Sequence, residues 1–184
     1  MKTLVCFGDS ITARELDENG RDRLTPRIAK EMPDWKVVNS GVSGNTTVDA
    51  LLRIEEDVLA LSPDFVTVLL GANDSAIHRN VDIELYEENL RKITSLIGPE
   101  KTLLISAAPV VESRQDARKN DTLQDFARVV ERVAADTGAY YLNFFEKMIG
   151  HPEYEDFLTE DGLHFNYKGY EFLSHAVLTK LKSI

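Results

Sequence analysis

The sequence predicts an α/β protein in which a parallel sheet lies between two layers of helices. Short apolar runs alternate along the chain with longer amphipathic stretches, and one helical pattern separates each pair of runs. Parallel strands need such crossovers, which are right-handed and place helices on both faces of the sheet. With 184 residues, 43% of them hydrophobic, the chain is expected to form one domain with one core over residues 1–184.

Five runs are expected to be strands. The first, TLVCF, is apolar throughout and stops at a glycine, as expected for a strand buried on both faces. The later runs KVVN, FVTVLL, TLLIS and AYYLN are similarly short and rich in branched or aromatic side chains. The expected strands are residues 3–7, 36–39, 65–70, 102–106 and 139–143.

A helix is expected after each strand. The second helix is preceded by Thr46, which resembles a capping box with Asp49. The last has an apolar stripe that includes Tyr170 and Leu173, with Asn166 as its cap. The expected helices are residues 22–32, 47–60, 83–97, 120–136 and 168–182.

Composition excludes several classes of function. The formal charge of −10 disfavours binding to nucleic acid or to anionic membrane surfaces. Cys6 is the single cysteine, so no internal disulfide forms and the thiol is expected in the core. The apolar run before Gly8 is too short for a signal peptide, and no run approaches membrane-spanning length, so we expect no membrane insertion and a cytoplasmic location.

Polar residues suited to catalysis follow the ends of several strands. The first strand runs directly into GDS, which places Ser10 in a turn. The second is followed by SGVSGN with Gly44, the third by GAND with Asn73, and the fifth, after an intervening stretch, by DGLH with Asp161 and His164. Ligands of such sheets bind beyond the carboxyl ends of the strands, so these residues are expected to share one cleft.

These four blocks, in this order, resemble the SGNH or GDSL-type hydrolases, which are esterases and lipases with a flavodoxin-like sheet. The resemblance covers nearly the whole chain, from VCFGDSIT to TEDGLHFNYKGY. It implies that Ser10 is the nucleophile, His164 the general base and then acid, and Asp161 its orienting partner. It also implies an oxyanion hole made of the backbone amides of Ser10 and Gly44 and the side-chain amide of Asn73.

The chemistry of these residue types agrees with those roles. A serine hydroxyl is a weak nucleophile at neutral pH, so an imidazole must take its proton and return it to the leaving alcohol. A carboxylate stabilises the imidazolium and selects the tautomer whose free nitrogen faces the serine. Each oxyanion donor lowers the barrier by on the order of 3 kcal/mol. No metal and no cofactor is required.

Other readings of the same residues remain as alternatives. Ser43 is a rival serine, but GVSGN lacks the glycine spacing of a nucleophile elbow, which favours a turn serine. Asp9 and Asp74 are expected to bond nearby backbone amides and hold their turns. A metal-dependent phosphoesterase would use the carboxylate, amide and imidazole side chains of these blocks as ligands of a metal ion. Activity that survives EDTA would exclude that function. A flavin or nucleotide binder would need a glycine-rich phosphate motif that the turns lack.

Within the hydrolases, the expected substrate is a small carboxylic ester. Thioesterase, lysophospholipase and carbohydrate deacetylase activities are alternatives within the same family. The AAPVV run after the fourth strand offers small apolar material, so Pro109, Val110 and Val111 are expected to bind a short acyl chain. Specificity is expected to rise from acetyl to about butanoyl or hexanoyl, since each buried methylene contributes about 0.8 kcal/mol, and then to fall. Arg14 or Arg21, in the polar loop after Ser10, is a candidate substrate contact.

Overall fold

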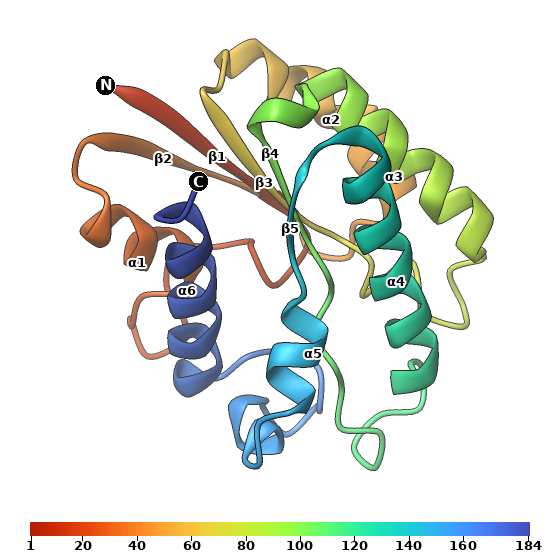
Figure 1. Cartoon of the computed structure of the whole chain (residues 1–184). Coiled ribbons are helices and arrows are strands. Elements are labelled where there is room, and N and C mark those ends of the chain that lie inside the picture. Colours follow the sequence, from red (N-terminus) through yellow and green to blue (C-terminus); the bar gives the residue numbers. More distant parts are fainter.

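The computed structural model describes residues 1–184, and its five strands form one parallel sheet between layers of helices (Figure 1). The strands lie in the order β2-β1-β3-β4-β5, so the first strand pairs with the second on one side and with the third on the other. This confirms the three-layer α/β/α prediction. The strands are β1 Lys2–Gly8, β2 Trp35–Gly41, β3 Phe65–Leu69, β4 Thr102–Ile105 and β5 Tyr140–Leu142.

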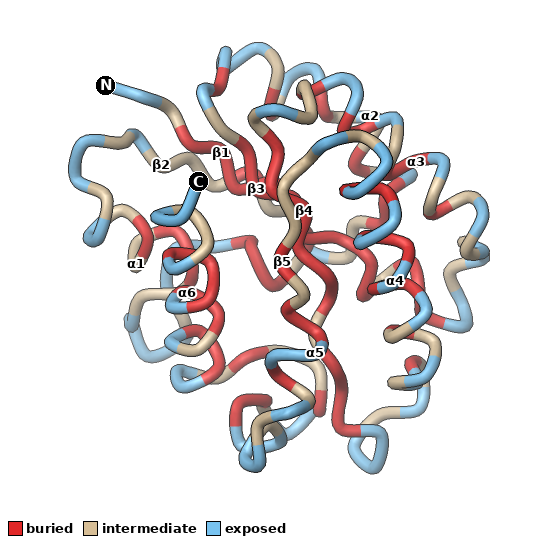
Figure 2. Tube along the Cα trace, viewed as in Figure 1, coloured by how far each residue is buried: buried red, intermediate tan, exposed pale blue.

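The central strand β1 shows why its sequence is apolar throughout. Successive side chains of a strand point to opposite faces. Leu4 and Cys6 therefore pack with α1 and α6, whereas Val5 and Phe7 pack with α2, α3 and α4. The central strands β1, β3 and β4 are mostly buried and the edge strands β2 and β5 only partly so, whereas exposed residues lie mainly on the outer faces of the helices and in the loops (Figure 2). The helices are α1 Leu24–Glu31, α2 Thr47–Asp57, α3 Ile83–Ile97, α4 Asn120–Thr137, α5 Phe144–Ile149 and α6 Tyr167–Leu181.

Two differences from the expected elements have local causes. Helix α2 ends at Asp57 because Val58 leaves the helical conformation, and a short 3₁₀ helix, Leu59–Leu61, completes the stretch that was expected to be α-helical. Helix α5 was not expected, because six residues are too few to show a helical period. It starts at Asn143, whose side chain accepts a hydrogen bond from the backbone N–H of Glu146.

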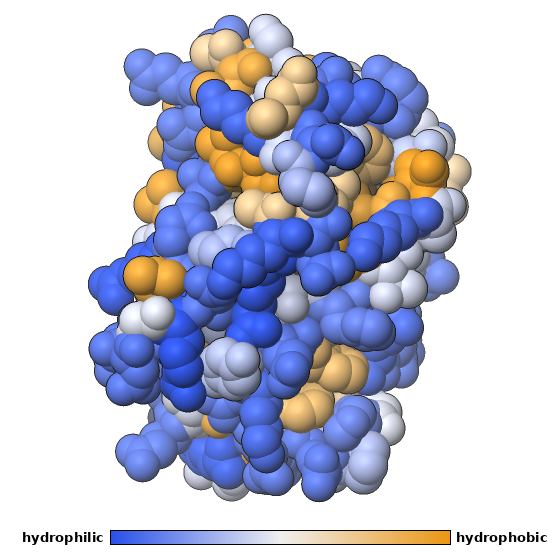
Figure 3. Space-filling view, turned by 90° about the vertical axis from the view of Figure 1, so that its left-hand side faces the viewer, coloured by the Kyte–Doolittle hydropathy of each residue, from blue (hydrophilic) through white to orange (hydrophobic).

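The side of the molecule that carries α1 and α6 is mainly hydrophilic, with apolar patches concentrated toward the amino ends of the strands (Figure 3). None of the helices combines the length and the apolar composition needed to span a bilayer.

Candidate active site

The site is built first around the turn that follows β1. The carbonyl of Asp9 accepts hydrogen bonds from the N–H groups of Thr12 and Ala13, at 3.2 and 2.9 Å. The carboxylate of Asp9 accepts a third, from the N–H of Ile11, at 2.9 Å. Asp9 thus holds the turn that contains Ser10 through both its carbonyl and its carboxylate. The sequence predicted the second of these bonds, from a nearby backbone amide to the side chain.

The turn before α6 brings a histidine to this serine. His164 Nε2 lies 3.1 Å from Ser10 Oγ, across 154 positions of sequence. On the other side of the ring, His164 Nδ1 lies 2.6 Å from Asp161 Oδ2. Three residues that were expected to meet therefore form one continuous hydrogen-bonded chain, with the imidazole in the middle.

Asp161 is held as an anion by its surroundings. Partial burial by itself would raise the pKa of Asp161. Hydrogen bonds from the His164 ring, the Thr159 hydroxyl and the backbone N–H groups of Leu163 and His164 outweigh it and hold that pKa well below the usual range of a carboxyl. Gly162, in the left-handed region with φ of 67°, makes the tight turn between carboxylate and imidazole.

Two backbone amides near Ser10 have no acceptor within the chain. One is the N–H group of Ser10 itself and the other is the N–H group of Gly44. Both residues lie outside the helices and strands, so no element supplies an acceptor for these groups. Gly44 has φ of 83°, a conformation that favours glycine. The capping box of Thr46 and Asp49 is present as predicted and fixes the start of α2 just after this turn. Free amides at such a position are suited to stabilising a negatively charged oxygen.

The side chain of Asn73 adds a third donor group. Its Nδ2 donates to the carbonyl of Asn45 at 3.0 Å. Because an amide nitrogen carries two hydrogens, one N–H remains available. Its Oδ1 accepts a hydrogen bond from Arg118 Nη2 at 3.0 Å.

Asp74, next in sequence, does not hold its own turn but connects two elements. Its carboxylate accepts hydrogen bonds from the backbone N–H and the hydroxyl of Thr47, at 2.9 and 2.5 Å, so it joins the turn after β3 to the start of α2. Burial raises the pKa of Asp74, and burial likewise raises the pKa of Asp9 to about 6. No group of three or more histidine, cysteine or acidic side chains is arranged to hold a metal ion.

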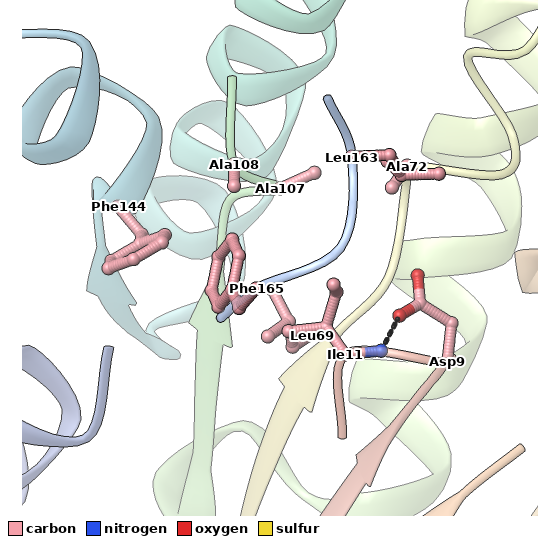
Figure 4. Close-up of a pocket in the computed structure, with 9 residues that line it drawn as sticks. All are labelled: Asp9, Ile11, Leu69, Ala72, Ala107, Ala108, Phe144, Leu163 and Phe165. Carbon is pink, nitrogen blue, oxygen red and sulfur yellow. Dashed lines mark hydrogen bonds between the residues drawn. The ribbon is translucent and has the colours of Figure 1, made fainter. Parts of the chain in front are cut away.

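A small, mainly apolar cavity adjoins the site, and Figure 4 shows the residues that line it. Three residues of its lining are chain neighbours of polar site residues: Ile11 next to Ser10, Ala72 next to Asn73, and Phe165 next to His164. Its free volume of about 10 Å³ is close to the least that one water molecule needs. The full lining is Asp9, Ile11, Leu69, Ala72, Ala107, Ala108, Phe144, Leu163 and Phe165.

The residues expected to bind the acyl chain are buried and are not part of the lining of this cavity. Val110 and Val111 are buried at 0% and 2% exposure, Val110 in a cluster with Leu123 and Val111 in the core beside α6. Pro109 is buried as well. The Val111 N–H donates to the carbonyl of Gly162, in the turn between Asp161 and His164, at 2.9 Å. The alanines that precede these residues in the AAPVV run are the ones that line the cavity.

In front of Ser10 lies a wider polar cleft of about 590 Å³. Both predicted candidates, Arg14 and Arg21, line it, and so does Ser43. Arg21 is paired with Asp17, whereas the guanidinium of Arg14 makes no hydrogen bond or ion pair. The full lining is Ser10, Arg14, Leu16, Asp17, Glu18, Asn19, Arg21, Arg23, Ser43, Thr159, Glu160, Asp161, His164, Phe165, Asn166 and Tyr170.

Sequence reasoning missed two arginines at the site. Arg23 donates to the carbonyl of Ser10 at 2.5 Å and lies over the ring of Tyr170, with its guanidinium carbon 4.7 Å from the ring centre. Arg118 is 7% exposed and contacts both Ala72 and Asn73. Neither has a local sequence signal, because an arginine in a polar loop is usually solvated.

Comparisons with known proteins found similar sequences and a similar solved structure. Residues 6–172 match the model of the GDSL-like Lipase/Acylhydrolase family. The chain is 28% identical to the acetylxylan esterase of Geobacillus stearothermophilus over 79% of this chain and 72% of that protein. It is 32% identical to the isoamyl acetate-hydrolyzing esterase 1 homolog of Bos taurus over 92% and 77% of the two chains. The crystal structure of the lipase/acylhydrolase from Enterococcus faecalis superimposes with a TM-score of 0.93 at 32% identity, covering 100% of this chain and 96% of that one.

Proposed function

The chain belongs to the GDSL-like lipase/acylhydrolase family and is a carboxylic ester hydrolase; we propose that it removes acetyl and other very short acyl groups through an acyl-enzyme intermediate on Ser10. The observation that carries the proposal is the continuous contact from Ser10 Oγ to His164 Nε2, at 3.1 Å, and from His164 Nδ1 to Asp161, at 2.6 Å.

In the first half of the reaction, Ser10 Oγ attacks the ester carbonyl while His164 Nε2 takes the hydroxyl proton. The carbonyl oxygen becomes an oxyanion, which the free N–H groups of Ser10, Gly44 and Asn73 stabilise. His164 then gives its proton to the oxygen of the leaving alcohol, the C–O bond of the ester breaks, and an acyl-serine remains.

In the second half, water replaces the alcohol. His164 Nε2 takes a proton from the water, the hydroxyl oxygen adds to the acyl carbon, and a second oxyanion forms in the same place. Its collapse returns the proton to Ser10 Oγ and releases the carboxylic acid. Asp161, held ionised, stabilises the imidazolium in both halves.

The size of the acyl group follows from the apolar cavity. Its lining combines three alanines with leucine, isoleucine and phenylalanine side chains, and the free volume is about 10 Å³. A methyl group fits such a space, whereas each further methylene requires the lining to move. The expected optimum is therefore acetyl, shorter than the butanoyl or hexanoyl expected from Pro109, Val110 and Val111.

The other side of the ester is expected to be a polar alcohol. The cleft in front of Ser10 is lined mostly by charged and amide side chains and is wide enough for a sugar unit. One relative carries the name acetylxylan esterase. Both observations favour an acetylated polyhydroxy compound over a phospholipid or a long-chain thioester.

Covalent labelling tests the nucleophile. An organophosphonate ester mimics the tetrahedral intermediate, so it should add once per chain, and peptide mass spectrometry should locate it on Ser10. Ser43→Ala should label normally, and Ser10→Ala should not label. An adduct on Ser43 in the unaltered protein would refute the assignment.

An acyl-length series tests the cavity. The ratio kcat/KM on p-nitrophenyl esters from two to sixteen carbons, below micellar concentrations, should be highest at two carbons and fall steeply beyond four. Ala108→Leu, which fills the cavity, should lower the rate on butanoate more than on acetate. A rise toward long chains would show that the acyl group lies outside the cavity and would favour a lysophospholipase or long-chain thioesterase.

A further inference from the structure

We propose that Arg118 is a positioning residue for ester hydrolysis, acting through Asn73 to keep the oxyanion donor correctly oriented; this rests on the function proposed above. Arg118 belongs to the loop between β4 and α4, and its side chain crosses to the turn after β3. There Nη2 donates to Asn73 Oδ1 at 3.0 Å, and Nε donates to the carbonyl of Ala72.

The orientation of the Asn73 amide follows from what a guanidinium can do. Arginine carries only donors, so it must face the oxygen of the amide and never its nitrogen. With Oδ1 held by Arg118, Nδ2 points the other way, where it meets the carbonyl of Asn45 at 3.0 Å and keeps one N–H free. A reversed amide would present its oxygen to the oxyanion, and the two would repel each other.

Arg118 itself is held in place from both directions. Its backbone N–H donates to Gln115 Oε1 at 2.9 Å, and Gln115 Nε2 donates back to its carbonyl at 2.8 Å. The carbonyl of Ala117 accepts from Ile77 N–H at 3.0 Å, which ties this loop to the segment that follows Asn73. The side chain therefore has little freedom to release the amide.

The partners of Arg118 point to a role beyond stability. Every hydrogen bond from its guanidinium goes to a neutral acceptor; no carboxylate forms an ion pair with it, and the charges of Asp9 and Asp161 act on it only at longer range. A buried cation with neutral partners is an unfavourable way to join two loops. A charge-assisted bond to Oδ1 also polarises the amide, which makes its N–H groups stronger donors.

A double-mutant cycle on p-nitrophenyl acetate separates this role from a purely structural one. Asn73→Ala should lower kcat by about 10²- to 10³-fold, as for other oxyanion donors. Arg118→Met should lower kcat by about 10- to 100-fold, with KM changed less than threefold. In the Asn73→Ala background, Arg118→Met should cost less than about threefold more, because the amide through which Arg118 acts is gone.

Two further variants keep the test decisive. Arg118→Lys, which retains a donor and a charge, should fold and recover part of the activity; it replaces Arg118→Met in the cycle if the latter does not fold. Lys119→Met removes the neighbouring exposed cation and should stay within twofold of the unaltered enzyme.

Additive losses in the cycle, or wild-type kcat in Arg118→Met or Asn73→Ala, would overturn the inference. Phosphonate labelling of Ser10 is independent of the cycle. Additive losses with normal labelling would remove only the role of Arg118, whereas loss of labelling at Ser10 would remove the proposed nucleophile.

Discussion

Ser10 and Ser43 both line the polar cleft, but only Ser10 lies within hydrogen-bond distance of a histidine. Because the nucleophile and its base act as a unit, Ser10→Ala and His164→Ala should each lower kcat by on the order of 10⁴-fold or more on p-nitrophenyl acetate. Ser43→Ala should remain within about tenfold of the unaltered enzyme. A dead Ser43→Ala beside an active Ser10→Ala would reverse the assignment.

Asp9 should make the stability of the protein depend on pH. Burial raises the pKa of Asp9 to about 6, above the value of about 4 expected in the unfolded chain. The folded state therefore binds this proton more tightly, so its stability falls as the pH rises from about 4 to about 6. Above that range the loss is complete, and the ionised carboxylate lowers the free energy of unfolding by on the order of 3 kcal/mol.

Asp9→Asn keeps an oxygen to accept the Ile11 N–H but cannot ionise. It should be more stable than the unaltered protein at pH 7.5, and the difference should shrink to near zero at pH 4. Urea unfolding of both proteins from pH 4 to pH 8 measures this difference. A difference that does not vary with pH would contradict the assignment of the proton to Asp9.

At the residue scale, motifs located the polar centre of the site but not what supports it. The structure brings Ser10, His164 and Asp161 together because the turn after β1 lies next to the turn before α6. Arg118 could not be found this way, since only the folded chain brings it to Asn73. The AAPVV run is a related case: it is apolar throughout, and composition alone does not tell that its alanines face the cavity whereas Pro109, Val110 and Val111 are buried away from it.

At the scale of elements, the close approach of β2 to the turn after Ser10 depends on a glycine. A Cβ built on Gly41 would lie 2.3 Å from the backbone nitrogen of Ala13 and 2.6 Å from the carbonyl carbon of Thr12. That backbone cannot retreat freely, because the side chain of Asn39 donates to the carbonyl of Thr12 at 2.8 Å.

Gly41→Ala should therefore lower the free energy of unfolding by about 3 kcal/mol or more and also reduce kcat, because the displaced turn carries the nucleophile. Gly138→Ala is the matched control. Its φ of 83° makes a side chain cost about 1 kcal/mol, but no atom lies within 4 Å and the site is distant. Chemical denaturation and acetate hydrolysis measure the two effects. Equal losses in both variants would show that the contact with Ala13 is not decisive.

Elements with strong local signals were predicted closely. Helix α3 occupies the expected residues 83–97, and the capping box at the start of α2 is formed. Helix α5 was missed because Asn143 is a cap for only six residues. Local propensity identifies an element when its period repeats several times, and a single turn and a half falls short of that.

At the scale of the whole molecule, the order of the strands had no counterpart in the sequence pattern. The chain passes from β1 to β2 on one side and then to β3 on the other, so the direction of winding reverses at β1. A crevice opens at the carboxyl ends of the strands at such a point, and Ser10 lies there. The apolar cavity and the polar cleft are separate pockets that share only Phe165 in their linings.

This separation predicts that recognition of the acyl group and of the alcohol can be changed independently. Among the eleven arginines of the chain, Arg14 alone has a guanidinium without a hydrogen bond or ion pair, and it lines the cleft in a left-handed backbone conformation with φ of 66°. Such a backbone is unfavourable for arginine, which points to a role for this position in binding.

Arg14→Ala should lower kcat/KM on an acetylated sugar by about tenfold, mainly through KM, because one or two hydrogen bonds from a charged donor are lost. On p-nitrophenyl acetate, whose leaving group makes no such bonds, the same variant should stay within about twofold. Arg128→Ala, on the exposed face of α4, should leave both substrates unaffected. Equal losses on both substrates would instead assign Arg14 to holding the turn of Ser10. No loss on either would place the alcohol away from this side of the cleft.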